Sequence, residues 1–256
     1  MSGIGLVVAL PREIPAGFVR IDTLERVGPH TFAVYQSAPA TGQHVAVQAG
    51  VGRIRAAEGA RLLIRRFSPQ ALASFGFAGG LTPGLARGTL IIAAEVVYED
   101  SSRTLVAANR DLVEQLQAAA DAEELPVRQG RLVTCRHIVA DPAAKAALRA
   151  RSGASAVDME TVGIAEVAHE AGLPWVAVRA IVDSAEESLP AACLTMLRQD
   201  GSVAPGRLIQ SICRSPQQLW HFLRLAGNSA TARRHLSQAF ERWSKSLTVP
   251  CDQEPG

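Results

Sequence analysis

Two stretches decide the fold of this chain: Ser155-Ala156-Val157-Asp158-Met159-Glu160 and, shortly downstream, Val178-Arg179-Ala180-Ile181-Val182-Asp183. In the first, an apolar run reaches Glu160 just where a segment with helical periodicity, 161–171, begins. The second is a β-branched strand that ends on Asp183. Ligands of α/β proteins bind beyond the carboxyl ends of the sheet strands. Two carboxylates delivered to that edge therefore predict acid–base chemistry on a small molecule.

Each of these carboxylates also has a purely structural interpretation. Glu160 could be a helix N-terminal residue stabilised by the helix dipole, and Asp183 could cap a following helix.

The rest of the chain alternates between strand-like and helix-like runs. The strand-like runs are 5–10, 32–37, 45–49, 71–76, 90–97, 130–134 and 175–182, and the helix-like runs are 56–67, 112–122 and 143–150. This alternation predicts a mixed or parallel sheet covered by helices. No linker divides the chain, so we expect one domain over residues 1–246 and a disordered tail over 247–256.

Composition narrows the class of protein. The chain has 256 residues, 48% hydrophobic and 20% charged side chains and a net charge of +2, values typical of a soluble globular protein. We expect no nucleic-acid partner, because such proteins carry a concentrated basic face. The apolar start at 4–10 has neither a preceding basic residue nor a small-residue cleavage site, so we expect no signal peptide.

The cysteines indicate neither a metal site nor a disulfide framework. Cys135, Cys193, Cys213 and Cys251 are widely separated and form no Cys-x-x-Cys pair. We expect a cytoplasmic protein without a metal or a cofactor.

Two glycine motifs follow predicted strands. Gly50-Val51-Gly52 resembles a dinucleotide fingerprint, but Ala56 stands near the place of the third glycine and no acidic residue ends a strand at the expected distance. We interpret it as a tight strand-to-helix turn whose backbone can approach a ligand. We expect Gly76-Phe77-Ala78-Gly79-Gly80 to be a glycine-rich turn of the same kind.

In this order along the chain, these segments resemble the nucleoside phosphorylase/nucleosidase superfamily, and most closely its 5′-methylthioadenosine/S-adenosylhomocysteine nucleosidase branch. The matching pieces are Val7 to Glu13, Gly50 to Arg53, Gly76 to Leu81 with Gly88, Val157 to Glu160, Gly172 to Pro174 and Val178 to Asp183. The resemblance implies a single-domain, three-layer α/β/α fold with a central mixed, twisted sheet. After Asp183, the chain looks more like the hopanoid-associated branch, which is thought to remove adenine from adenosylhopane.

The resemblance also implies a reaction, the cleavage of the N-glycosidic bond between a purine and ribose. It assigns Asp183 as the acid that protonates the purine and Glu160, with Met159 packed beneath it, as the group that holds the ribose. Glu13 would be the base that activates water. Pro11 and Arg12 replace the acidic residues that usually precede this glutamate in the family, and a simple helix-start role for Glu13 is the alternative.

Four further residues would surround the ribose and the base: Phe77, Gly79, His137 and Ile138. His137 stands where the family usually has a phenylalanine, and a histidine can both stack on a purine and form a hydrogen bond to it. The alternative is a partly exposed loop histidine.

Departures from the family favour hydrolysis over phosphorolysis. The phosphorylases resembling this chain carry an arginine two positions before the Gly76 equivalent and a Ser or Thr directly after it, and both contact phosphate. Here these positions are Ser74 and Phe77, which lack the guanidinium and the hydroxyl. A phosphorylase and a non-catalytic nucleoside-binding protein are the alternatives.

The expected partners are a nucleoside, which could be lipid-linked, and a second copy of the chain, since superfamily members are dimers or larger. After Pro190, segments 206–215 and 217–227 predict amphipathic helices in which apolar residues alternate with arginines. They could pack on the sheet, or they could contact a membrane surface and take up the tail of a lipid-linked nucleoside.

Overall fold

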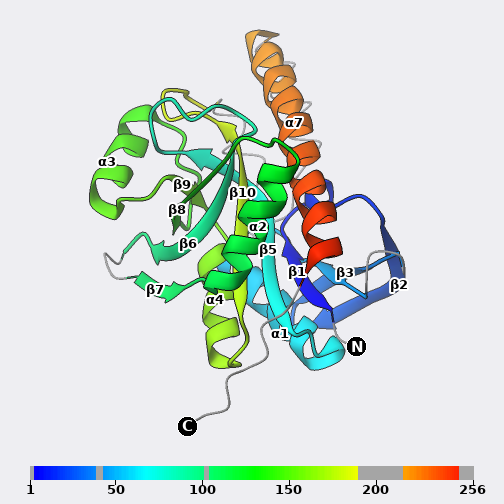
Figure 1. The fold of residues 1–256 in the computed structure, drawn as a ribbon. Coiled ribbons are helices and arrows are strands. Elements are labelled where there is room, and N and C mark those ends of the chain that lie inside the picture. The colour runs from blue at the N-terminus through cyan, green and yellow to red at the C-terminus, as the bar shows by residue number, and fades with distance from the viewer. Residues whose placement is uncertain (1–2, 39–42, 101–103, 190–215, 248–256) are drawn as a thin grey trace.

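The computed structural model describes residues 3–38, 43–100, 104–189 and 216–247. The strands are β1 (Ile4–Val8), β2 (Phe18–Val27), β3 (His30–Ser37), β4 (Val45–Gln48), β5 (Ala71–Gly80), β6 (Leu90–Tyr98), β7 (Thr104–Ala107), β8 (Val127–Thr134), β9 (Ala156–Asp158) and β10 (Trp175–Asp183). The helices are the short 3-10 helix η1 (Pro11–Glu13) and the α-helices α1 (Arg53–Phe67), α2 (Arg110–Ala122), α3 (Pro142–Ser152), α4 (Thr161–Glu170) and α7 (Pro216–Ser246). Figure 1 shows the sheet running through the middle of the molecule with helices on either side.

The sheet is mixed, and part of it closes on itself. Strand β5 lies at its centre, parallel to β1 on one side and to β10 on the other. Strand β10 continues through β6, β8 and β9, and β9 pairs back onto Gly79 and Gly80 of β5. The other half extends from β1 through β4 and β3 to β2. The carboxyl ends of β1, β5 and β10 therefore meet at one place.

Apolar side chains fill both faces of the sheet. Along β1, Val7 belongs to the cluster that α1 and α4 cover, while Leu6 and Val8 belong to the cluster that α2 and α7 cover. This alternation follows from the two-residue period of a strand buried on both faces. The predicted three-layer α/β/α architecture with a central mixed sheet is confirmed.

The structure corrects two details of the sequence analysis. The segment 76–80 is not a glycine-rich turn, because β5 continues to Gly80 and pairs there with both β9 and β10. Strands β2, β7 and β9 were not predicted as strands. The hairpin of β2 with β3 contains an irregular register between Ile21 and Leu24, which breaks the alternation that a sequence pattern relies on.

The carboxyl-terminal part of the chain contains one long helix. Predicted segment 217–227 lies inside α7, whereas 206–215 and most of the tail 247–256 lie outside the described residues. Farther along α7, Ala232, Leu236, Phe240 and Trp243 are buried and pack on the sheet, and the ring of Phe240 contacts that of Phe75 on β5. No helix in the described part of the chain is long and apolar enough to cross a membrane.

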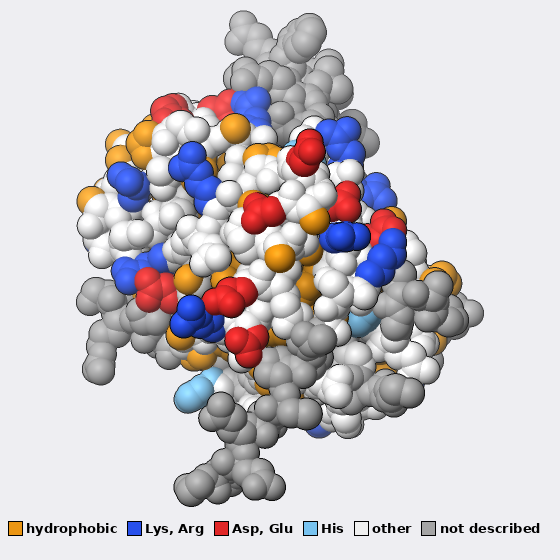
Figure 2. All heavy atoms as spheres, in the orientation of Figure 1, with side chains coloured by type: hydrophobic (Ala, Val, Ile, Leu, Met, Phe, Trp, Pro, Cys, Tyr) orange, Lys and Arg blue, Asp and Glu red, His pale blue; other side chains and the backbone are white. Residues whose placement is uncertain are grey.

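Charges on the visible surface are interspersed. Figure 2 shows Lys and Arg side chains beside Asp and Glu side chains over the face presented there. The described residues of that face therefore carry no extended field of one sign.

Candidate active site

The site lies where β1, β5, β9 and β10 end, and two glycines of β5 make room for it. A Cβ on Gly76 would lie 3.1 Å from Oε1 of Glu13 and 3.3 Å from Nη1 of Arg179. A Cβ on Gly79 would lie 3.2 Å from Oδ2 of Asp183. All three distances are tighter than ordinary van der Waals contact, so the missing side chains let the carboxyl groups lie directly against the strand.

Glu13 is buried and held by three backbone amides. Its Oε2 accepts hydrogen bonds from the N–H groups of Ala9 (2.9 Å) and Leu10 (2.7 Å), and its Oε1 accepts one from Phe77 (2.9 Å). Burial raises the pKa of Glu13, opposed by these hydrogen bonds and by the charge of Arg179. Glu13 is the last residue of η1, and its contact with Phe77 of β5 goes beyond a helix-start role.

Glu160 occupies the N-cap position of α4 but does not cap the helix with its side chain. Instead, its Oε1 accepts a hydrogen bond from the N–H of Gly52 (3.0 Å), at the strand-to-helix turn before α1. Burial is the largest cause that raises the pKa of Glu160 to about 8, followed by the neighbouring charge of Asp158. Glu160 therefore lies at a helix N-terminus, as its structural interpretation expects, but its side chain bonds to the turn before α1 and not to the amides of α4.

A buried arginine links the two glutamates. Nε of Arg179, on β10, donates to Oδ2 of Asp158 (2.9 Å), and Nη2 donates to the hydroxyls of Ser74 (2.8 Å) and Thr161 (2.8 Å). Its charge lowers the pKa of both Glu13 and Glu160. Thr134 and Thr161 also donate to Asp158, so the buried ion pair is surrounded by polar partners, as such pairs must be to persist.

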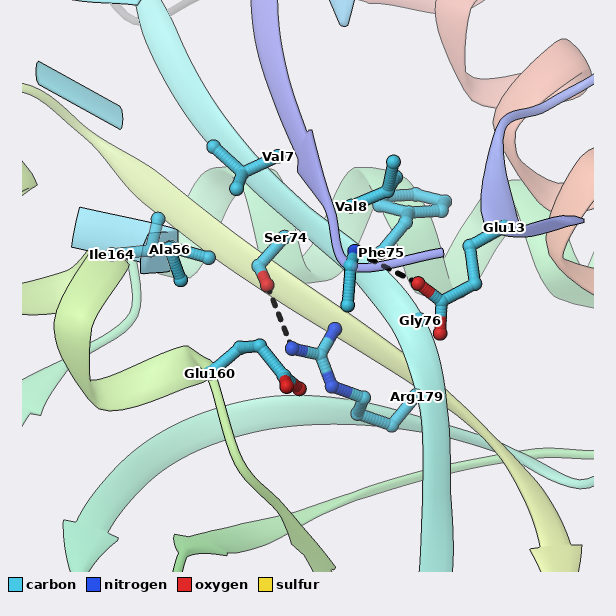
Figure 3. A pocket seen from close by; sticks show the side chains of 11 residues that line it. Val7, Val8, Glu13, Ala56, Ser74, Phe75, Gly76, Glu160, Ile164 and Arg179 are labelled. Carbon is cyan, nitrogen blue, oxygen red and sulfur yellow. Dashed lines mark hydrogen bonds between the residues drawn. The ribbon is translucent and has the colours of Figure 1, made fainter. Parts of the chain in front are cut away.

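Glu13, Glu160, Arg179 and Ser74 line one narrow pocket, shown in Figure 3. The guanidinium of Arg179 lies between Glu160 on one side and Glu13 on the other, with Ser74 bonded to it from β5. Apolar side chains close the remainder of the wall: Val7, Val8, Ala56, Phe75 and Ile164.

Asp183 lies farther along β5, opposite Gly79 in the strand register. Three residues separate Gly79 from Gly76, which corresponds to about 10 Å along a strand. The Oδ2 atom of Asp183 accepts a hydrogen bond from Nζ of the buried Lys145 (2.5 Å). Burial raises the pKa of Asp183, whereas Lys145 and, to a smaller degree, Arg87 lower it. The alternative role of Asp183, as a cap of the next helix, concerns a segment that extends beyond the described residues.

The remaining predicted residues lie at this edge with different degrees of exposure. Met159 is half-buried directly before Glu160, and Phe77 and Gly79 are half-buried on β5. Ile138 is half-buried in the segment after β8, whereas His137 beside it is exposed.

Sequence reasoning missed three charged residues of the site: Arg179, Asp158 and Lys145. Two of them, Arg179 and Lys145, left a signal in the sequence. Arg179 is the one charged residue inside the apolar strand that ends on Asp183, and Lys145 occupies the core-facing side of α3 together with Leu148 and Ser152. A charge at a position that periodicity assigns to the core needs a buried partner.

A metal site finds no support in this geometry. Within the described ranges, no group of three or more His, Cys, Asp or Glu side chains could hold a metal ion.

Comparison with known proteins places the chain in a family. The model of the Phosphorylase superfamily matches residues 3–195. A 5′-methylthioadenosine/S-adenosylhomocysteine nucleosidase from Exiguobacterium is 27% identical over 233 residues, which cover 84% of this chain and 99% of the relative. The nucleosidase of the same name from Actinobacillus succinogenes is 32% identical over 215 residues, covering 74% and 92%.

The fold has close counterparts among solved structures. The crystal structure of 5′-methylthioadenosine/S-adenosylhomocysteine nucleosidase from Neisseria meningitidis, in complex with methylthio-immucillin-A, superposes with a TM-score of 0.73 at 22% identity, covering 96% of this chain and 100% of that one. With the family model matched over most of its length and the same architecture, this chain belongs to the phosphorylase superfamily.

Proposed function

We propose that this protein is a purine nucleosidase, an N-glycosidase that hydrolyses the bond between adenine and ribose in an adenosine-type nucleoside. The observation that carries the proposal is the placement of three buried carboxyl groups along one strand edge. Glu13 and Glu160 flank Arg179 at one end, and Asp183 lies beside Gly79 at the other. The names of the matching relatives support the same reaction.

Breaking an N-glycosidic bond builds positive charge on the ribose and negative charge on the departing base. The site must therefore stabilise a cationic sugar, protonate the base and activate a nucleophile on the opposite face of the sugar. In our proposal, Glu160 binds the ribose hydroxyls and stabilises the cation, Asp183 protonates the purine, and Glu13 takes a proton from the attacking water. Enzymes that invert configuration at a glycoside also place an acid and a base across the sugar.

The surroundings of Glu13 suit a general base. Burial raises its pKa, which brings its proton affinity closer to neutral pH, where a base is most effective. Four of the five N–H groups of the Arg179 guanidinium donate to Asp158, Ser74, Thr161 and the carbonyl of Val178. Among the described residues, one Nη1 hydrogen remains for a ligand beside Glu13. These two groups could hold one water molecule between them.

The same electrostatics favours water over phosphate as the nucleophile. A phosphate in this pocket would face two carboxyl groups, Glu13 and Glu160, and one guanidinium that already neutralises Asp158. This guanidinium has little charge left to offer a phosphate, and a desolvated anion without a cationic partner is costly. Ser74 stands where the phosphorylases carry the arginine that contacts phosphate. Its hydroxyl accepts a hydrogen bond from Arg179 of β10, and the guanidinium of Arg179 is already held by other partners in the protein.

The test is adenine release measured with and without inorganic phosphate. We expect release without phosphate, with free ribose-containing product and no sugar phosphate. A strict requirement for phosphate would establish the phosphorylase instead, and tight nucleoside binding without any turnover would establish a binding protein.

For the finer substrate class, we propose an adenosine that carries a lipid, such as adenosylhopane in hopanoid biosynthesis, bound with peripheral membrane contact. The support is the sequence after Asp183, which resembles the hopanoid-associated branch. The screen compares adenosine, methylthioadenosine, S-adenosylhomocysteine and a lipid-linked adenosine, together with co-sedimentation on anionic liposomes at low and high salt. Efficient turnover of methylthioadenosine without liposome binding would contradict this substrate class.

We further propose that the enzyme acts in the cytoplasm as a homodimer. The resemblance supports the dimer, since superfamily members are dimers or larger, and the scattered cysteines support a reducing compartment. Light scattering at micromolar concentration tests the first statement, and a monomer would contradict it.

A further inference from the structure

Lys145 is a buried ammonium that the reaction scheme above does not use. The chain has only two lysines among its 26 basic residues, and Lys145 is fully buried on α3. Burying an ammonium is costly unless its hydrogens are bonded. All three of its donors are used: Nζ donates to Oδ2 of Asp183 (2.5 Å), to the carbonyl of Ser184 (2.6 Å) and to the carbonyl of Glu187 (3.0 Å).

Asp183 depends on this lysine for its placement. Within the described part of the chain, Lys145 is the only hydrogen-bond donor to the Asp183 carboxyl group, and it reaches Oδ2 alone. The carboxyl group lies directly against Gly79, where a Cβ would come within 3.2 Å of Oδ2 and 3.5 Å of Oδ1. The second oxygen, Oδ1, has no hydrogen-bond donor among the described residues.

We propose that Lys145 is the positioning residue of the general acid: it orients Asp183 so that Oδ1 meets the purine, and it stabilises the carboxylate that remains when the proton leaves. This inference rests on the proposed nucleosidase function. The proton passes from the Asp183 carboxyl group to a ring nitrogen of the purine, while the electron pair of the N-glycosidic bond moves onto the base. Lys145 transfers no proton in this step, and after the products leave solvent returns one proton to Asp183 and takes from Glu13 the proton of the attacking water.

The charges around Asp183 support this role for Lys145. Arg87 also lowers the pKa of Asp183, but its Nε donates to Glu187 (3.0 Å), which it also pairs with through Nη2. Glu187 accepts the N–H of Ser184 as well, and Glu186, the next acidic side chain, is exposed. The direct contact to the acid is therefore the ammonium of Lys145. Without Lys145, burial would raise the pKa of Asp183 further, and Asp183 would be a weaker acid.

The experiment compares Lys145→Met and Lys145→Gln with the wild-type protein across pH. Met keeps the apolar volume of the side chain, and Gln keeps a hydrogen-bond donor without the charge. We expect kcat for adenine release to fall roughly 10–100-fold, the rate equivalent of one charged hydrogen bond. The limb of the kcat–pH profile that belongs to Asp183 should move upward by about 1–3 pH units, with KM changed far less. A Gln variant with the wild-type pH profile would overturn the charge-based role.

Lys245→Met is the matched control. Lys245 is the other lysine of the chain, half-exposed on α7 and paired with Glu241 four residues earlier. We expect this variant to keep the kcat, KM and pH profile of the wild type. A loss of activity in this variant equal to that of Lys145→Met would overturn the inference.

A second readout does not depend on turnover. The Asp183 carboxyl carbon is titrated by NMR in protein labelled with 13C-aspartate, and Asp183→Asn assigns the signal. An upward displacement of its titration midpoint in Lys145→Met supports the inference, and an unchanged midpoint overturns it. If the wild-type protein releases adenine from none of the nucleosides, the proposed function fails, and the NMR result still shows whether Lys145 controls Asp183.

Discussion

The two ends of the site hold their carboxyl groups in different ways. At one end, Glu13 accepts hydrogen bonds from three backbone amides. At the other, Asp183 accepts one from the ammonium of Lys145. Amides position a carboxylate without adding a full charge, so burial still raises the pKa of Glu13 as a base requires. An ammonium opposes the effect of burial directly, which suits a group that must release its proton.

The largest effect is expected from Arg179→Met, at the end of the site that contains Glu13 and Glu160. It leaves Asp158 buried without its cation, and removing one partner of such a pair typically costs about 3–5 kcal/mol of unfolding free energy. Denaturant unfolding measures the loss. Adding Asp158→Asn should recover part of it, because the uncompensated charge is then gone. A single variant with wild-type stability would show that Arg179 does not hold this end together.

Asp183→Asn tests the proposed general acid at the other end of the site. An amide cannot donate a carboxyl proton, so we expect kcat for adenine release to fall roughly 10²–10⁴-fold, as for a lost general acid. The matched control is Asp141→Asn at the N-cap of α3, where Oδ1 accepts from Ala143 and Ala144. Asparagine caps a helix as well as aspartate does, so this control should keep its activity. Full activity in Asp183→Asn would remove Asp183 from the mechanism.

The Glu160→Gln variant should change stability and turnover in different ways, and its effect on stability should depend on pH. The pKa of Glu160 is raised from 4.5 to about 8, so between these values the folded state binds a proton that the unfolded state releases. The wild type therefore loses stability as pH rises through this window. We expect the Gln variant to be the more stable one by up to about 5 kcal/mol above pH 8 and little different below pH 4.5.

The thermal midpoints at pH 4.5 and 8.5 measure this difference, and a gap between variant and wild type that did not grow with pH would contradict the cause given for the raised pKa. The same variant should lose turnover above pH 8, where the wild-type Glu160 is ionised and a neutral amide stabilises a cationic ribose less well. Retained turnover would contradict the role proposed for Glu160.

The smallest effect is expected from Ser74→Ala. It removes one of four described hydrogen bonds of the Arg179 guanidinium and should cost about 0.5–1.5 kcal/mol of stability. Turnover should change less than in any variant above, because Asp158 and Thr161 still hold the arginine. Denaturant unfolding and the adenine assay are compared on the same preparation. A collapse of activity would assign Ser74 a direct contact with substrate or water.

The sequence by itself determined the layers of the fold and the positions of three carboxyl groups. The apolar period of 3.6 located α1, α2, α3 and α4, and buried runs located β1, β4, β5, β6 and β10, because each of these elements has a local pattern. Glu160 and Asp183 followed from their places at the ends of such elements, and Glu13 from the resemblance to a family.

Only the tertiary structure decided how these carboxyl groups are held. The guanidinium of Arg179 meets Asp158 and Ser74 across three different strands, and Lys145 meets Asp183 across 38 positions of sequence. Local patterns carry no information about such pairings, since they depend on which strands lie side by side. Strand β5 shows the same limit: its glycines predict a turn in isolation, and pairing with β9 and β10 keeps them extended.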